Sequence, residues 1–107
     1  MTRPIVSLIP IDRYDDPTRL DEALRQALEP FGGMGAFVRP GQRVLLKPNL
    51  VAPAHAEMAV CTHPAVAAAV ARAATAAGAS QCDLGDGPGV STASAVCRSC
   101  GIPDALR

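Results

Sequence analysis

The hydrophobic positions of the chain fall into short runs and helical stripes that alternate along the sequence. A run of apolar residues between two prolines, residues 4–9, predicts a short buried strand. Asp16 and Pro17 are typical of a helix start, because a carboxylate caps free amides and proline is tolerated at the first helical position. Large apolar residues follow at helical spacing before the glycine pair 32–33, namely Leu20, Leu24, Leu28 and Phe31. Asp21 and Arg25 are spaced to form an ion pair on another face of this helix.

Two further strands and two further helices are predicted downstream. Residues 44–46 are apolar without alternation, which predicts a strand that is buried on both faces of a parallel sheet and is ended by Pro48. The alanine-rich stretch 65–77 follows Pro64 and precedes Gly78, an order typical of a helix, and its small side chains allow close packing on two sides. Residues 79–86 predict a third, less apolar strand, and Ser91 or Thr92 can cap a last helix that runs to Gly101.

This alternation predicts an α/β fold with a small parallel sheet and right-handed βαβ crossovers. Three strands make a thin sheet, and the sequence stops after a helix, where another strand would be expected. We therefore expect residues 1–107 to be a single α/β domain, or the amino-terminal portion of a larger one, or a subunit completed by a partner.

Composition and charge exclude some function classes. Ten Lys and Arg residues balance ten Asp and Glu residues, and the aromatic residues are Tyr14, Phe31 and Phe37, so neither a basic field nor a stacking platform for nucleic acid is present. No apolar run approaches the roughly 18 to 20 residues that span a bilayer, and residues 1–11 do not have the pattern of a secretory signal. We therefore expect a cytoplasmic protein that binds neither nucleic acid nor a membrane.

In a reducing compartment the four cysteines are expected to be thiols or metal ligands. Cys97 and Cys100 form a lone CxxC motif, which is weak evidence for a metal without a second such pair. Buried, inert thiols that pack a helix against the sheet are one interpretation. A metal or iron–sulfur site that also uses Cys61 and Cys82 is the alternative, although Cys82 lies in the middle of a predicted strand.

Three polar clusters follow predicted strands or begin a predicted helix. Because ligands bind outside the carboxyl ends of parallel strands, we expect these clusters to meet at one edge of the sheet. Their members are Lys47 and Asn49, Thr62 and His63, and Asp86, Gly87 and Gly89.

The chemistry of these residues suits a small anionic ligand. Lys47, the only lysine of the chain, can neutralise an anion, and Asp86 can orient the ligand or a metal. The amides of the helix that begins after Thr62 and His63 can bind the same anion. Snorkelling of Lys47, helix capping by His63 and turn stabilisation by Asp86 are the structural alternatives. No GxGxxG, GxxxxGK[ST], GxSxG or HExxH motif occurs, so no catalytic residue or known reaction can be assigned.

These blocks resemble the family called domain of unknown function 362. The resemblance covers about residues 40–102 and rests on four blocks in order: Val44 to Val51 with its KPN core, Cys61 to Pro64, Ala77 to Gly89 with GDGPG, and Cys100 to Ile102. It implies an α/β fold and site residues among the seven named above. Members of this family are usually longer and are often described as iron–sulfur proteins, because many carry a separate ferredoxin-like module that this sequence does not contain.

Three hypotheses about function follow. The first is an anion-binding domain that works in redox metabolism linked to iron–sulfur proteins, with a cluster in the complete protein or in a ferredoxin-like partner module. The second is a non-catalytic interaction subunit or fragment, whose alanine-rich helix packs on a partner or on a second copy. The third is a protein that binds a metal or an iron–sulfur cluster through its own cysteines.

Overall fold

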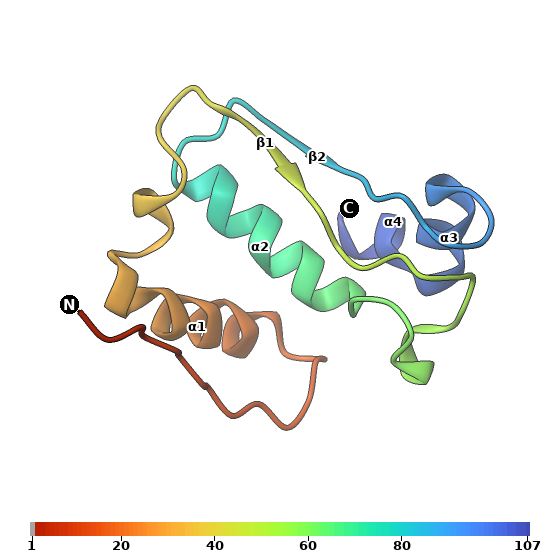
Figure 1. The fold of residues 1–107 in the computed structure, drawn as a ribbon, viewed down its shortest axis with the longest axis horizontal. Helices are drawn as coiled ribbons and strands as arrows, with labels where there is room; N and C mark the ends of the chain where they lie inside the picture. Colours follow the sequence, from red (N-terminus) through yellow and green to blue (C-terminus); the bar gives the residue numbers. More distant parts are fainter. Residues whose placement is uncertain (1) are drawn as a thin grey trace.

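A computed structural model describes residues 2–107 (Figure 1). It has four α-helices and two strands in the order α1 (Pro17–Leu28), β1 (Arg43–Leu46), α2 (Pro64–Ala76), β2 (Gln81–Leu84), α3 (Ala93–Cys100) and α4 (Ile102–Ala105). Short 3-10 turns occupy Glu29–Phe31, Met34–Ala36 and Ala56–Met58. The described chain is therefore a small α/β fold.

The sheet consists of β1 and β2, which run parallel with Arg43 opposite Gln81 and Leu46 opposite Leu84. Helix α2 connects the two strands, so β1, α2 and β2 form one βαβ unit. The parallel sheet is confirmed, but the prediction of three strands is wrong for the described residues, which contain two. Strand β2 spans Gln81–Leu84 and is therefore shorter at both ends than the predicted 79–86.

The expectation that β1 is buried on both faces is wrong. Val44 and Leu46 are half-buried, while Leu45 between them is 68% exposed. Helix α2 packs against one face of the sheet, and no element of residues 2–107 covers the other face. Apolar side chains in a continuous run therefore alternate between a packed and an open environment.

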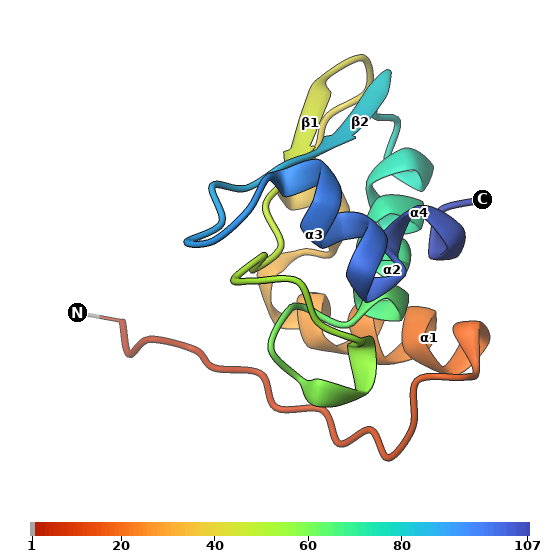
Figure 2. The same cartoon turned by 90° about the vertical axis from the view of Figure 1, so that its right-hand side faces the viewer.

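The predicted amino-terminal strand, residues 4–9, is also wrong. The segment is extended but pairs with neither strand, and Val6 and Leu8 are 79% and 87% exposed. It runs along the α1 side of the molecule, away from the sheet (Figures 1 and 2). Ile9 at its end, and Ile11 beyond it, line a pocket with apolar side chains of α1 and α2. Without a neighbouring strand, the hydrophobic pattern alone does not make this segment part of the sheet.

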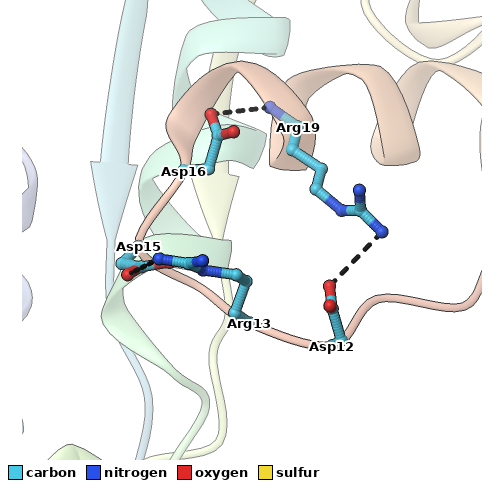
Figure 3. A network of polar contacts seen from close by, with 5 residues as sticks. All are labelled: Asp12, Arg13, Asp15, Asp16 and Arg19. Carbon is cyan, nitrogen blue, oxygen red and sulfur yellow. Dashed lines mark hydrogen bonds and ion pairs between the residues drawn. The ribbon is translucent and has the colours of Figure 1, made fainter.

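Helix α1 begins as predicted at Asp16, whose side chain accepts a hydrogen bond of 3.2 Å from the backbone N–H of Arg19. Figure 3 shows the polar contacts around this start: the Arg19 guanidinium lies 3.3 Å from Asp12, and Arg13 pairs with Asp15. All of these groups are exposed, so each ion pair adds little stability. Their shared effect is to fix the turn through which the chain enters α1.

The far end of α1 differs from the prediction. Proline at position 30 tightens the chain into a 3-10 turn, and Gly32 closes it with a positive φ of 97°. Leu20 is buried and Leu24 and Leu28 are half-buried, but Phe31 lies beyond the α-helix and is 40% exposed. Phe31 continues the helical spacing in the sequence but lies in the 3-10 turn and not in the α-helix.

The predicted ion pair between Asp21 and Arg25 does not form. Arg25 instead donates two hydrogen bonds, of 2.9 and 2.7 Å, to Glu22 of its own helix. Asp21 accepts hydrogen bonds from Arg72 of α2, the shortest of which is 2.6 Å. This pair connects two helices that are distant in the sequence, so spacing within α1 gave no sign of it.

Helix α2 lies between the sheet and α1 and also contacts α4 (Figures 1 and 2). Its buried residues other than Pro64 are all alanines: Ala67, Ala68, Ala69 and Ala74. Side chains of one carbon allow neighbouring backbones to approach on several sides at once, which confirms the predicted close packing. Gly78 ends the segment with a φ of 103°, as the sequence predicted.

Besides the buried alanines of α2, a cluster of buried side chains lies where the carboxyl-terminal helices pack on the loop after β1. It contains Leu50, Val96, Cys100 and Ile102, each at most 2% exposed. Thr92 caps α3 by accepting from the backbone N–H of Ala95, as predicted. Gly101 ends α3 with a φ of 83°, and the one-turn helix α4, which the sequence did not predict, follows it directly.

Candidate functional site

An ion pair joins the carboxyl ends of the two strands. Lys47 follows β1, and its Nζ lies 2.8 Å from Oδ1 of Asp86, which follows β2. The other carboxylate oxygen, Oδ2, accepts a hydrogen bond of 2.9 Å from the backbone N–H of Leu50. The Lys47 side chain is 69% exposed, whereas that of Asp86 is 11% exposed. The carboxylate is therefore the fixed member of the pair, and it holds an otherwise mobile ammonium at the edge of the sheet.

These contacts lower the pKa of Asp86 to about 2. The largest cause is the hydrogen bond from Lys47, and backbone N–H groups of Leu50 and Gly87 act in the same direction. Partial burial opposes them, because it disfavours the charged form. Asp86 is consequently an anion at neutral pH and is not a general acid there.

The loops that follow β1 and β2 are held together by further hydrogen bonds. The backbone N–H of Asn49 donates to Oγ1 of Thr62 over 2.9 Å, and the Thr62 N–H donates to the Asn49 carbonyl over 3.0 Å. The N–H of Gly89 donates to the carbonyl of Val51 over 3.2 Å. Asn49 and Gly89 therefore contribute backbone hydrogen bonds to this region. The polar clusters lie close together, as expected for loops at the carboxyl ends of parallel strands.

His63 caps the amino end of α2. Its Nδ1 accepts from the N–H of Ala65 over 3.2 Å, and its carbonyl accepts from the N–H groups of Val66 and Ala67. Pro64 has no N–H. The first-turn amides of α2 are thus already bonded within the helix, and anion binding at this helix end stays a prediction. The imidazole stacks on Tyr14, with ring centroids 4.2 Å apart.

A pocket of about 240 Å³ lies beside Lys47, between the end of β1 and α2. Thr62 and Lys47 contribute the polar side chains of its lining, and the rest is apolar, including Leu46, Val66 and Val70. Oγ1 of Thr62 accepts from Asn49, which leaves its hydroxyl hydrogen free to donate. The ammonium of Lys47 has three donors, of which Asp86 takes one. Two residues with hydrogen-bond donors, Lys47 and Thr62, therefore line an otherwise apolar pocket.

The four cysteines are all free thiols. Cys61 and Cys97 pack against the core cluster that contains the buried Cys100, while Cys82 lies in β2. Burial is the main cause that raises the pKa values of Cys97 and Cys100. No group of three or more His, Cys, Asp or Glu side chains in residues 2–107 is arranged to hold a metal. The residues present therefore do not fit an iron–sulfur cluster.

Sequence reasoning missed two participants in this region. The Leu50 backbone N–H is a partner of Asp86, and no sequence signal identifies a backbone donor of this kind. Tyr14 reaches His63 from the segment before α1, a contact set by tertiary packing. Gly87 was predicted, and its backbone N–H is a partner of Asp86.

The fold and the site define a small α/β domain with an ion-paired sheet edge. The family model for the domain of unknown function DUF362 matches residues 44–107, more than half of the chain, and the chain therefore belongs to this family. It is also 43% identical over 96 residues to the thylakoid-associated protein sll1697 of Synechocystis sp. (strain ATCC 27184 / PCC 6803 / Kazusa). The match covers 90% of this chain and 29% of that protein, so the chain spans under a third of its relative. No solved structure shows a significant match.

The matched residues contain the candidate site. Lys47, Thr62 and Asp86 all lie within 44–107, whereas Tyr14 lies outside. Within residues 2–107, no helix combines the length and the apolar character needed to cross a membrane.

Proposed function

We propose that the carboxyl edge of the sheet binds a small anionic ligand through Lys47 and Thr62. The observation that carries this proposal is that Lys47, whose ammonium pairs with Asp86 and keeps donors to spare, lines the 240 Å³ pocket together with Thr62. In this proposal, Asp86 is a positioning residue and Asn49 orients the Thr62 hydroxyl. His63 acts by capping α2, and Gly87 and Gly89 shape the loop around Asp86.

Binding can be tested on the intact chain by amide NMR with sodium acetate and inorganic phosphate as probes. We expect shifts to concentrate at residues 46–50 and 62, and Lys47→Met to abolish them. Arg43→Met is the matched control, because Arg43 is a basic residue at the opposite end of β1 and also faces a carboxylate, Asp83 at 3.6 Å. Shifts that are absent, or that persist unchanged in Lys47→Met, would overturn the proposal.

A second candidate is an interaction domain that packs on another part of a longer protein or on a partner. The uncovered face of the sheet favours it, since Leu45 is exposed there. Contact through the alanine-rich helix would use its partly exposed alanines, such as Ala71, Ala73 and Ala76, since four others are buried against the chain's own sheet and helices. Light scattering tests the case in which the partner is a second copy of this chain: a monomer whose mass is unchanged by Leu45→Glu contradicts self-association.

The link to iron–sulfur redox metabolism stays a prediction from the family resemblance. Because the cysteines of this chain do not form a ligand set, we place any cluster in a ferredoxin-like module or partner. Iron and sulfide analysis of anaerobically purified protein tests this placement, and stoichiometric iron on this chain alone would contradict it. We also propose a cytoplasmic location, which cell fractionation tests against the thylakoid association named for the Synechocystis relative.

A further inference from the structure

We propose that the ligand of this site is a short aliphatic monocarboxylate, with its carboxylate on Lys47 and Thr62 and its hydrocarbon body in the adjoining pocket. This inference rests on the proposed function and adds the ligand class to it. Three features of the site select this class: its charge, the chemistry of the pocket walls and the pocket volume.

The charge of the site selects a single negative group. Lys47 is the only cationic side chain among the pocket-lining residues, and Asp86 already shares its ammonium at 2.8 Å. A second negative charge on a ligand would face the Asp86 carboxylate with no further cation to compensate it. Phosphate and dicarboxylates are therefore disfavoured relative to a monocarboxylate.

The donors suit a carboxylate. Of the two polar residues that line the pocket, Lys47 has N–H donors and Thr62 has a hydroxyl hydrogen, which the Asn49 bond leaves free. A carboxylate has two oxygen acceptors and can accept from both donors at once. The ligand's carboxylate is thus placed at the rim without displacing Asp86 from Leu50.

The walls select a hydrocarbon body. Leu46 and Leu84 from the strands face Val66, Ala67 and Val70 from α2 across the pocket. Its volume of about 240 Å³ is below the roughly 300 to 1,000 Å³ of pockets for drug-sized ligands. It corresponds to about eight water molecules at roughly 30 Å³ each. A body of about three to five carbon atoms takes up roughly half of such a space and leaves room for the carboxylate and its water.

Binding of this class should strengthen with chain length. Each buried methylene contributes about fourfold in affinity. Isovalerate, which carries three more carbon atoms than acetate, should therefore bind at least about tenfold more tightly than acetate, allowing for incomplete burial. Isovaleramide has the same body without the charge, so it should bind more weakly than isovalerate.

The test is an amide NMR titration of the full chain with isovalerate, acetate, isovaleramide and inorganic phosphate. Val70→Thr keeps the side-chain shape but places a hydroxyl in the wall, and should remove most of the advantage of isovalerate over acetate. Val90→Thr is the matched control, because Val90 is exposed and lies outside the pocket. Lys47→Met should remove binding of both carboxylates.

The outcomes separate this inference from the proposed function. If acetate and phosphate bind through Lys47 but isovalerate binds no more tightly, the aliphatic class is wrong and the anion site stands. If isovalerate binds equally well to Lys47→Met, or if no probe binds, both proposals are overturned. Equal effects of Val70→Thr and Val90→Thr would also overturn the placement of the hydrocarbon body.

Discussion

Lys47 and Asp86 follow two neighbouring parallel strands, and the ammonium nitrogen of one lies 2.8 Å from a carboxylate oxygen of the other. Asp86 also accepts from the backbone N–H of Leu50, so one carboxylate fixes both the lysine and the loop after β1. Leu50 itself belongs to the buried core cluster. The candidate site and the core are therefore joined at this residue, and changes at Asp86 should affect both.

The first prediction concerns acid stability. The pKa of Asp86 is about 2 in the folded protein against an ordinary value of 3.8, so its ionised form stabilises the fold above pH 3.8. This contribution should be lost as the pH falls from 3.8 to about 2. Asp86→Asn should show a smaller loss of unfolding free energy over this range than the parent protein, as measured by urea unfolding at stepped pH.

Asp83→Asn is the matched control for this prediction, because it removes a half-exposed carboxylate from β2 without touching Lys47. Carbon NMR of the Asp86 carboxyl group gives an independent reading of the same titration. An Asp86 carboxyl that titrates near 3.8 would contradict the assigned contacts.

The second prediction concerns the cap of α2. Because Nδ1 of His63 accepts from the Ala65 N–H, His63→Ala should lower the free energy of unfolding by about 0.5 to 2 kcal/mol. His63→Asn should recover most of this loss, since asparagine is among the best capping residues. Urea unfolding of the three proteins measures the effect. Equal losses in the two variants would assign the stabilising role of His63 to its stacking on Tyr14 and not to the cap.

The third prediction compares two glycines with positive φ. A Cβ at Gly78 would lie 2.9 Å from the backbone Cα of Pro40, whereas one at Gly41 would meet nothing within 4 Å. Gly41→Ala should cost about 1 to 2 kcal/mol from its backbone conformation alone. Gly78→Ala should cost a further 1 to 3 kcal/mol or so, because the backbone of Pro40 must move. Equal thermal stability of the two variants would contradict the close approach of these segments.

The fourth prediction concerns the ion pair between α1 and α2. A double-mutant cycle with Asp21→Asn and Arg72→Gln should give a coupling energy of about 0.2 to 1 kcal/mol, as expected for a half-exposed pair. The same cycle for Asp21 and Arg25, which do not contact each other, is the control and should give none. Coupling in the control cycle, or its absence in the first, would contradict the observed pairing.

Local chemistry in the sequence determined most of the helix boundaries. Asp16 and Thr92 cap helices with their own side chains, and Gly32, Gly78 and Gly101 adopt the positive φ that ends a helix or turn. These effects act over a few residues, so they can be read without knowledge of the fold. The convergence of Lys47, Thr62 and Asp86 was also predictable, because parallel strands place their carboxyl ends at one edge.

Tertiary structure decided what depends on neighbours distant in the sequence. The hydrophobic pattern of residues 4–9 is that of a strand, but a strand needs a partner for its backbone, and β1 and β2 pair with each other. Leu45 is exposed because α2 covers one face of the sheet only. Asp21 binds Arg72 and not Arg25, and the Ala65 N–H at the start of α2 donates to His63. Hydrophobicity, charge and hydrogen-bonding capacity belong to single residues, whereas the partner of each group is set by packing.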